Sequence, residues 1–202
     1  MRLYHSPTTP YGRKVIVLLH ETGQAGDVEV ISSGGTPLDP GNQPLGVNPL
    51  GKIPALEPGD GTAIYDSRVI CRYLDERAGG KLYPPAPHLW QTLTLEATAD
   101  GILEAALLMV YESRLRPEDI RFQPWVEGQW AKIARALDAL EDRWMDHLNG
   151  PLDMGQIAVA CALGYLDFRH GARNWREGRA ELSTWYNAFS RRPSMKATEP
   201  AG

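Results

Sequence analysis

The chain has 202 residues, enough for one ordinary domain or two small ones. Its formal net charge of −4 argues against a nucleic-acid-binding protein, because such a protein needs a basic face. Apolar residues make up 43% of the chain, yet no apolar run in the sequence reaches the length that spans a membrane. These properties favour a cytoplasmic protein that binds neither nucleic acid nor a membrane.

The two cysteines, Cys71 and Cys161, lie far apart in the sequence. Neither belongs to a Cys-x-x-Cys motif or to a Cys/His cluster, so neither a disulfide framework nor a metal site is predicted. Both lie in apolar runs with helical spacing, which predicts that they are small buried side chains.

The first 79 residues are expected to alternate between strands and helices. Short apolar runs are separated by Gly and Pro, which are typical of turns. The sequence Pro-Gly-Asp-Gly at residues 58–61 is a hairpin signal. In chain order, the pattern predicts a strand at 2–5, a helix at 13–22, a strand at 27–32, strands at 52–56 and 62–65, and a helix at 66–78.

The rest of the chain is expected to be helical. Residues 80–87 are rich in Gly and Pro and predict a linker. Apolar periodicity then predicts helices at 90–114, 117–147, 153–169 and 180–190, followed by a polar tail. Pro124 is expected to kink or divide the second of these helices. Asp153 and Gln156 are spaced as in a capping box at the start of the third.

Two places in the first domain combine groups that can hold a ligand. Ile53-Pro54 lies where a strand should begin, and an X-Pro bond there is a candidate for the cis form, which exposes the backbone of Ile53. Asp66-Ser67 lies where a helix should begin. There Ser67 can donate to a ligand carboxylate and Asp66 can accept from an ammonium group. Alternatively, Pro54 is only a proline of an edge strand, and Asp66 and Ser67 only cap a helix.

Several hydroxyl groups lie between the first strand and the first helix, in the stretch YHSPTTPYGRK at residues 4–14. Ser6, Thr8 and Thr9 can be ordinary turn formers, or they can point at a ligand. From these residues alone, both interpretations stay open.

Taken together, these features resemble a soluble glutathione S-transferase along essentially the whole chain. The sequence NPLGKIPAL resembles the family's loop into its cis-proline strand, and YDSRVICRYLDE resembles its acidic-Ser helix start. The sequence PLDMGQIAVACALGYL resembles the capping-box helix of the family, with Asp153 and Gln156 in place of the usual Ser and Asp. TADGILEAALLMVYESR and FSRRPSMKATEP are most similar to small bacterial members.

The resemblance implies an α/β, thioredoxin-like N-terminal domain (βαβ-ββα) at residues 1–79, a linker at 80–87 and an all-α helical-bundle domain at 88–202. It also implies a homodimer that binds glutathione as co-substrate, without a metal. Ile53, just before a cis Pro54, would bond the cysteinyl backbone of glutathione. Lys52 would lie near the glycyl carboxylate, and Asp66 and Ser67 would hold the γ-glutamyl end.

By the same resemblance, Thr9 takes the position that is Ser in serine-type members and Cys in the thiol-transfer branch. A threonine hydroxyl can donate to the thiolate as serine does, but it cannot form a mixed disulfide. Ser6, Tyr4 and Tyr11 are alternative donors. The pattern Thr-Pro-x-Gly-x-Lys also resembles the bacterial Nu class, which has disulfide reductase activity, although Tyr11 replaces its Asn.

The electrophile pocket is expected between the domains, lined by Tyr11, Leu108, Tyr111 and Arg114. The sequence therefore predicts a glutathione transferase that stabilises the thiolate and conjugates it to an electrophile. The alternatives are a glutathione-dependent disulfide or peroxide reductase and a non-catalytic binding protein of the same fold.

Overall fold

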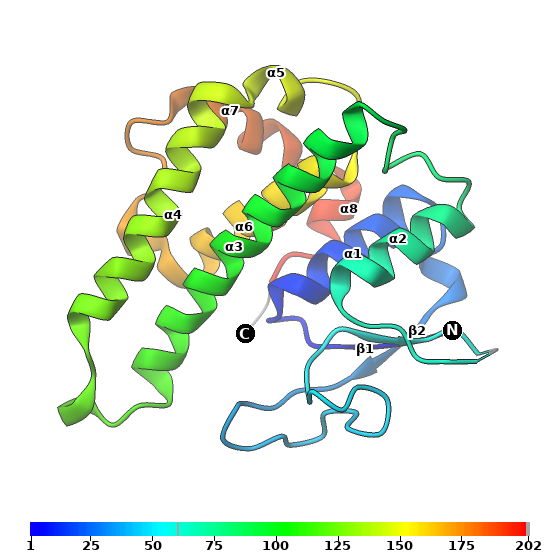
Figure 1. Ribbon diagram of the computed structural model, residues 1–202, viewed down its shortest axis with the longest axis horizontal. Helices are drawn as coiled ribbons and strands as arrows, with labels where there is room; N and C mark the ends of the chain where they lie inside the picture. Colours follow the sequence, from blue (N-terminus) through cyan, green and yellow to red (C-terminus); the bar gives the residue numbers. More distant parts are fainter. Residues whose placement is uncertain (60, 201–202) are drawn as a thin grey trace. The chain divides into compact units, whose positions relative to one another are not determined.

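The computed structural model describes residues 1–59 and 61–200, and Figure 1 shows their strands and helices. The chain separates into two compact units. The first consists of Met1–Leu89 and the C-terminal segment that begins at Pro193, and the second is Trp90–Arg192. The described strands all lie in the first unit.

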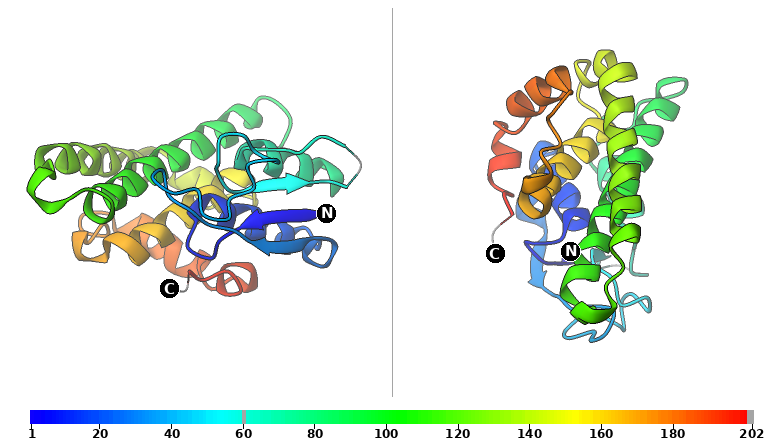
Figure 2. Two further views of the ribbon diagram at one scale, coloured as in Figure 1. Left: turned by 90° about the horizontal axis from the view of Figure 1, so that it is seen from below. Right: turned by 90° about the vertical axis from the view of Figure 1, so that its left-hand side faces the viewer.

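The first unit contains a mixed sheet with the strand order β2-β1-β3, which can be followed in Figure 2. The strands are β1 (Arg2–His5), β2 (Glu29–Ser32) and β3 (Ala55–Glu57). Strand β1 runs parallel to β2 and antiparallel to β3. Leu3, at the centre of β1, is fully buried and pairs with Val30 on one side and Leu56 on the other.

The strand predicted at residues 62–65 is reduced to a single bridge. Ile64 and Leu56 exchange backbone hydrogen bonds of 2.8 and 2.9 Å, and the pairing extends no further. The extended segment is short because helix α2 begins at Ser67, only three residues later. Asp60, in the predicted hairpin turn, lies outside the described residues.

Helices α1 (Pro10–Glu21) and α2 (Ser67–Arg77) lie side by side in the first unit (Figure 1). Pro10 begins α1, where the fixed φ of proline suits a helix start and its missing N–H costs nothing. A short 3₁₀ turn, η1 (Ala25–Asp27), leads to β2. The apolar residues of α1 that sequence periodicity selects are mostly buried, so this helix contributes a large part of the core.

The predicted linker is held to α2 by one buried carboxylate. Asp75 is 2% exposed and accepts hydrogen bonds from the backbone N–H groups of Lys81, Leu82 and Tyr83 at 2.9–3.1 Å. A carboxylate that accepts several N–H groups satisfies donors that the Pro-rich segment cannot pair with a strand or helix. The segment is thereby fixed to the first unit.

The C-terminal segment was expected to be a polar tail, and this prediction is wrong. It contains helix α8 (Pro193–Lys196), which packs on α1 (Figure 1). Arg13 is 5% exposed and donates to the carbonyl of Met195 at 3.1 Å and to Thr198 Oγ1 at 3.3 Å. Periodicity did not reveal this segment, because a helix of four residues with one buried apolar side chain, Met195, is too short to show a helical period.

The second unit is helical, as predicted. The long helix α3 (His88–Arg114), which begins in the first unit, is followed by η2 (Glu118–Ile120), α4 (Gln123–Arg143), α5 (Met145–Leu148), α6 (Met154–His170), η3 (Gly171–Arg173) and α7 (Ala180–Phe189). Every residue of α6 from Met154 to Leu166 is buried, which confirms the expectation from its apolar sequence. None of the helices in the described ranges is long and apolar enough to cross a membrane.

Pro124 was expected to interrupt a helix that starts near residue 117, but it lies in the first turn of α4 instead. A 3₁₀ turn and a bend precede Gln123, so no helical N–H is lost at the proline. The predicted helix also ends earlier, because Trp144 separates α4 from the short helix α5.

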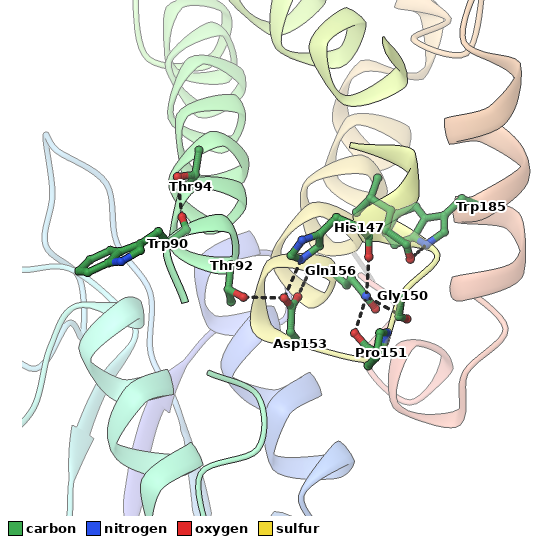
Figure 3. A network of polar contacts seen from close by, with 10 residues as sticks. Trp90, Thr92, Thr94, His147, Gly150, Pro151, Asp153, Gln156 and Trp185 are labelled. Carbon is green, nitrogen blue, oxygen red and sulfur yellow. Dashed lines mark hydrogen bonds and ion pairs between the residues drawn. The ribbon is translucent and has the colours of Figure 1, made fainter. Parts of the chain in front are cut away.

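The start of α6 is fixed by the buried network in Figure 3. Asp153 caps the helix, because its Oδ1 accepts from the N–H of Gln156 at 3.0 Å, as predicted. Its Oδ2 contacts Thr92 Oγ1 at 2.6 Å and His147 Nε2 at 2.7 Å (Figure 3). The Gln156 amide instead donates to the carbonyls of His147, Gly150 and Pro151 at 2.7–3.3 Å, so it anchors the preceding loop.

Replacing Asp153 by alanine is expected to lower the free energy of unfolding by about 3–5 kcal/mol. The change removes an N-cap, worth about 1 kcal/mol, and the two buried contacts of Oδ2 with Thr92 and His147, worth about 1–2 kcal/mol each. Asp66→Ala is the matched control, because Asp66 also caps a helix but is exposed. Denaturant unfolding measures both variants, and equal losses would show that the buried network adds nothing to the cap.

Candidate functional site

The turn between β1 and α1 places Thr9 at the start of the helix. The N–H of Thr9 donates to the carbonyl of Ser6 at 3.0 Å, and its own carbonyl accepts from Arg13 at 3.2 Å. Thr9 is thus the N-cap residue of α1, yet its hydroxyl makes no capping hydrogen bond. The side chain is half-buried at a helix end that carries a partial positive charge.

The neighbouring hydroxyl groups are used within the protein. Ser6 Oγ and Thr8 Oγ1 are 3.1 Å apart, and the N–H of Thr8 donates to Ser6 Oγ at 3.4 Å, so these two residues shape the turn. The Tyr4 hydroxyl donates to Glu57 Oε2 at 2.7 Å across the sheet, and this carboxylate raises the pKa of Tyr4. The Thr9 hydroxyl makes no hydrogen bond within residues 1–59 and 61–200.

The segment that leads into β3 has the geometry expected from its proline. The Ile53–Pro54 peptide bond is cis, Pro54 is buried and Ile53 is half-buried. Asn48, 2% exposed, holds the approach: its Nδ2 donates to the carbonyl of Lys52 at 2.8 Å, and its Oδ1 accepts from Leu50 at 3.0 Å. The Lys52 side chain is exposed. Asn48 is a structural residue of this loop that sequence reasoning did not select.

Asp66 is the N-cap of α2, so the interpretation of this residue as a helix cap is confirmed. Its Oδ1 accepts from the N–H of Arg68 at 2.9 Å, and its Oδ2 lies 3.3 Å from Arg68 Nη2. The Asp66 side chain nevertheless remains 57% exposed, so capping leaves the carboxylate open to solvent. Ser67, the first residue of the helix, is 3% exposed, and its hydroxyl makes no hydrogen bond to the other described residues.

The strand register brings the turn with Thr9, the cis proline and the start of α2 to the same end of the sheet. Tyr4 pairs with Ala55, so the antiparallel register leads from the end of β1 toward Pro54. Leu56 is bridged to Ile64, and the same direction leads toward Asp66. The turn containing Thr9, the cis proline and the start of α2 therefore emerge at the same end of the sheet.

The residues predicted to line the electrophile pocket belong to different units. Tyr11 lies in the first turn of α1, whereas Leu108, Tyr111 and Arg114 lie along α3 in the second unit. Leu108 and Tyr111 are half-buried, and burial raises the pKa of Tyr111. Their assignment to a common pocket stays a prediction.

A thioredoxin-like domain with a cis proline before β3 and a serine at the start of α2, followed by a helical domain, defines the class of soluble glutathione transferases. Residues 8–77 match the Glutathione S-transferase N-terminal domain family, and residues 123–188 match the C-terminal domain family. The chain belongs to the glutathione S-transferase superfamily.

Similar proteins cover the whole chain. A glutathione transferase family member from Pseudomonas fluorescens Pf-5 with bound glutathione is 47% identical, with a TM-score of 0.97 over 100% of this chain and 99% of that one. A second structure from the same organism, with bound S-(propanoic acid)-glutathione, is 46% identical, with a TM-score of 0.92 over 100% of both chains. The uncharacterized GST-like protein YibF of Escherichia coli is 34% identical over 99% of this chain and 98% of its own.

Proposed function

We propose that this protein is a glutathione S-transferase that stabilises the glutathione thiolate and transfers it to an electrophile. In this proposal Ser67 and Asp66 hold the γ-glutamyl end, the backbone of Ile53 before Pro54 bonds the cysteinyl residue, and Lys52 lies near the glycyl carboxylate. The glutathione bound to the Pseudomonas fluorescens neighbour supports this assignment of the ligand.

The observation that carries the proposal is the Thr9 hydroxyl at the N-terminus of α1. Ser6, Thr8 and Tyr4 use their hydroxyls within the protein, whereas that of Thr9 makes no hydrogen bond among the described residues. A donor at a helix N-terminus favours a bound anion, because the helix dipole and the hydroxyl both stabilise negative charge. Thr9 is therefore our choice as thiolate donor, ahead of Ser6, Tyr4 and Tyr11.

The chemistry requires the thiol to ionise near neutral pH. A free cysteine thiol has a pKa of about 8.5, so only a few per cent is thiolate at pH 7. Lowering this pKa by about 2 units takes about 2.7 kcal/mol of preferential stabilisation of the anion. One hydrogen bond to a charged acceptor contributes about 1.5–3 kcal/mol, and the helix end adds to it.

On the acceptor side we propose Tyr11, Leu108, Tyr111 and Arg114. The thiolate sulfur forms a bond to an electrophilic carbon, and the displaced electron pair leaves with a halide or, in an activated alkene, ends on a carbon that takes up a proton. The S-(propanoic acid)-glutathione bound to the Pseudomonas fluorescens neighbour is a conjugate with a carboxylate. A small electrophile that carries a carboxylate, drawn to Arg114, fits this proposal.

Two experiments test the function. Calorimetry should show glutathione binding, with weaker binding of the dipeptide Cys-Gly, which lacks the γ-glutamyl end. Turnover should be higher with an aryl halide than with a disulfide substrate, because residue 9 has no sulfur for a mixed disulfide. Absence of binding at millimolar glutathione contradicts both the transferase and the reductase hypothesis. Binding without turnover supports a binding protein, and disulfide turnover alone supports a reductase.

We also propose that the protein is a homodimer in the cytoplasm, as the resemblance to soluble glutathione transferases implies.

A further inference from the structure

A niche formed by a missing side chain lies beside the start of α1. A Cβ atom on Gly12 would come within 2.1 Å of His5 Nδ1 and within 2.9 Å of Thr9 Cγ2. The imidazole of His5 and the methyl group of Thr9 therefore fill the space that any larger residue at position 12 would need. Glycine is required here because of this close approach.

The methyl group of Thr9, rather than its hydroxyl, faces the helix. With Thr9 as N-cap, Gly12 is the third residue of the helix. The oxygen of an N-cap side chain normally accepts a hydrogen bond from the N–H of the second or third residue. Because Cγ2 lies toward Gly12 and the hydroxyl makes no capping bond, the methyl group occupies the inner position and the hydroxyl takes another staggered one.

Besides the N–H groups of the helix start, His5 is a second possible hydrogen-bond partner that the Thr9 hydroxyl does not use. His5 is 9% exposed, and its buried Nδ1 has no hydrogen-bond partner in the described part of the chain. Burial lowers the pKa of His5 to about 4, so the ring is neutral at pH 7 and one of its nitrogens is an acceptor. A hydroxyl in the place of the methyl group would face the helix N-terminus and the same niche that His5 Nδ1 borders, where, with the ring proton on Nε2, Nδ1 is an acceptor.

We propose that the Thr9 methyl group is a positioning element of the glutathione site: seated against Gly12 and His5, it keeps the hydroxyl from turning inward and directs it to the thiol. The inference rests on the proposed function, in which Thr9 is the thiolate donor. A β-branched side chain is stiff about χ1, which serine is not. Threonine then supplies the same donor as serine, with its direction fixed.

The decisive variant is Thr9→Ser, which keeps the hydroxyl and removes the methyl group. Serine has all three staggered positions available, so an equal distribution lowers the productive population about threefold, and the inward partners lower it further. The thiol pKa of bound glutathione, titrated by the ultraviolet absorbance of the thiolate, should rise by about half a unit or more. Affinity for S-methylglutathione, which has no thiol, should stay unchanged. A thiol pKa equal to or below that of the unmodified protein overturns the proposal.

The part played by His5 is tested in a double-mutant cycle. His5→Leu keeps an apolar wall for the niche but removes the inward acceptor. In that background Thr9→Ser should raise the thiol pKa by less than it does with His5 present. An equal rise in both backgrounds removes His5 from the proposal. Melting curves of all variants show whether the fold is retained.

Thr9→Val separates this inference from the function on which it rests. Valine keeps a methyl group in the niche and has no hydroxyl. If Thr9→Val raises the thiol pKa and Thr9→Ser does not, Thr9 is the donor but its methyl group has no positioning role. If neither variant changes the thiol pKa, the donor assignment itself is wrong.

Discussion

Thr9→Val is expected to raise the thiol pKa of bound glutathione by about 1–2 units and, at saturating glutathione, to lower kcat/KM for the electrophile by about 3–25-fold at pH 7. The reason is the loss of one hydrogen bond to a charged acceptor, which is worth about 1.5–3 kcal/mol, or about 1–2 pKa units. The sign follows from the charge: the hydroxyl stabilises the thiolate, so its removal favours the thiol. Activity should therefore recover as the pH is raised through the new thiol pKa.

Thr8→Val is the matched control, because the Thr8 hydroxyl lies in the same turn but contacts Ser6. It should leave the thiol pKa of bound glutathione close to that of the unmodified protein. The thiolate absorbance and the pH profile of kcat/KM give two independent measurements. A larger effect at Thr8 than at Thr9 would transfer the role of donor to the Ser6–Thr8 pair.

Ser67→Ala is expected to raise the Kd for glutathione by about 10–100-fold. Ser67 is 3% exposed at the start of α2, and its hydroxyl makes no hydrogen bond within the described residues, which leaves it available to the γ-glutamyl carboxylate. A hydrogen bond to a charged group is worth about 1.5–3 kcal/mol, and every 1.4 kcal/mol changes the affinity about tenfold. Because this interaction is remote from the sulfur, kcat at saturating glutathione should change little.

Calorimetry measures the loss of affinity, and Ser190→Ala is the control, because Ser190 follows α7 in the second unit. That variant should bind glutathione as the unmodified protein does. An unchanged Kd in Ser67→Ala would move the γ-glutamyl end elsewhere and leave Ser67 as a residue of the helix start only. Thermal melting checks that both variants are folded.

Local chemistry determined much of the fold. Asp153 caps α6 as predicted, because capping acts within one helical turn, whereas α1 begins at Pro10, three residues before the predicted start at residue 13. The apolar run from Met154 to Leu166 predicted a helix buried on all sides, and α6 is one. Pro124 was misread, since a proline inside a periodic pattern can either break a helix or begin one, and the periodicity does not distinguish the two.

The sequence could not reveal contacts that depend on distant residues. From the sequence, Arg13 was only the first residue of the helix predicted at 13–22, whereas the structure shows it buried and bonded to the C-terminal segment at Met195 and Thr198. Asp153 was recognisable as a cap, but its bonds to Thr92 and His147 were not. Such contacts arise from packing between segments that spacing along the chain does not relate.

The hydroxyl-rich stretch at residues 4–14 shows the same difference between what the local sequence predicts and what packing decides. By itself the sequence determined that hydroxyl groups lie between a strand and a helix, and resemblance to a family favoured Thr9 among them. Only the tertiary structure separated their roles, because Tyr4 bonds Glu57 from another strand, and the Thr9 methyl group lies toward Gly12 in a niche that His5 also borders. Neighbouring residues in the sequence show which side chains a turn contains, but the direction of each side chain depends on the distant residues that pack against it.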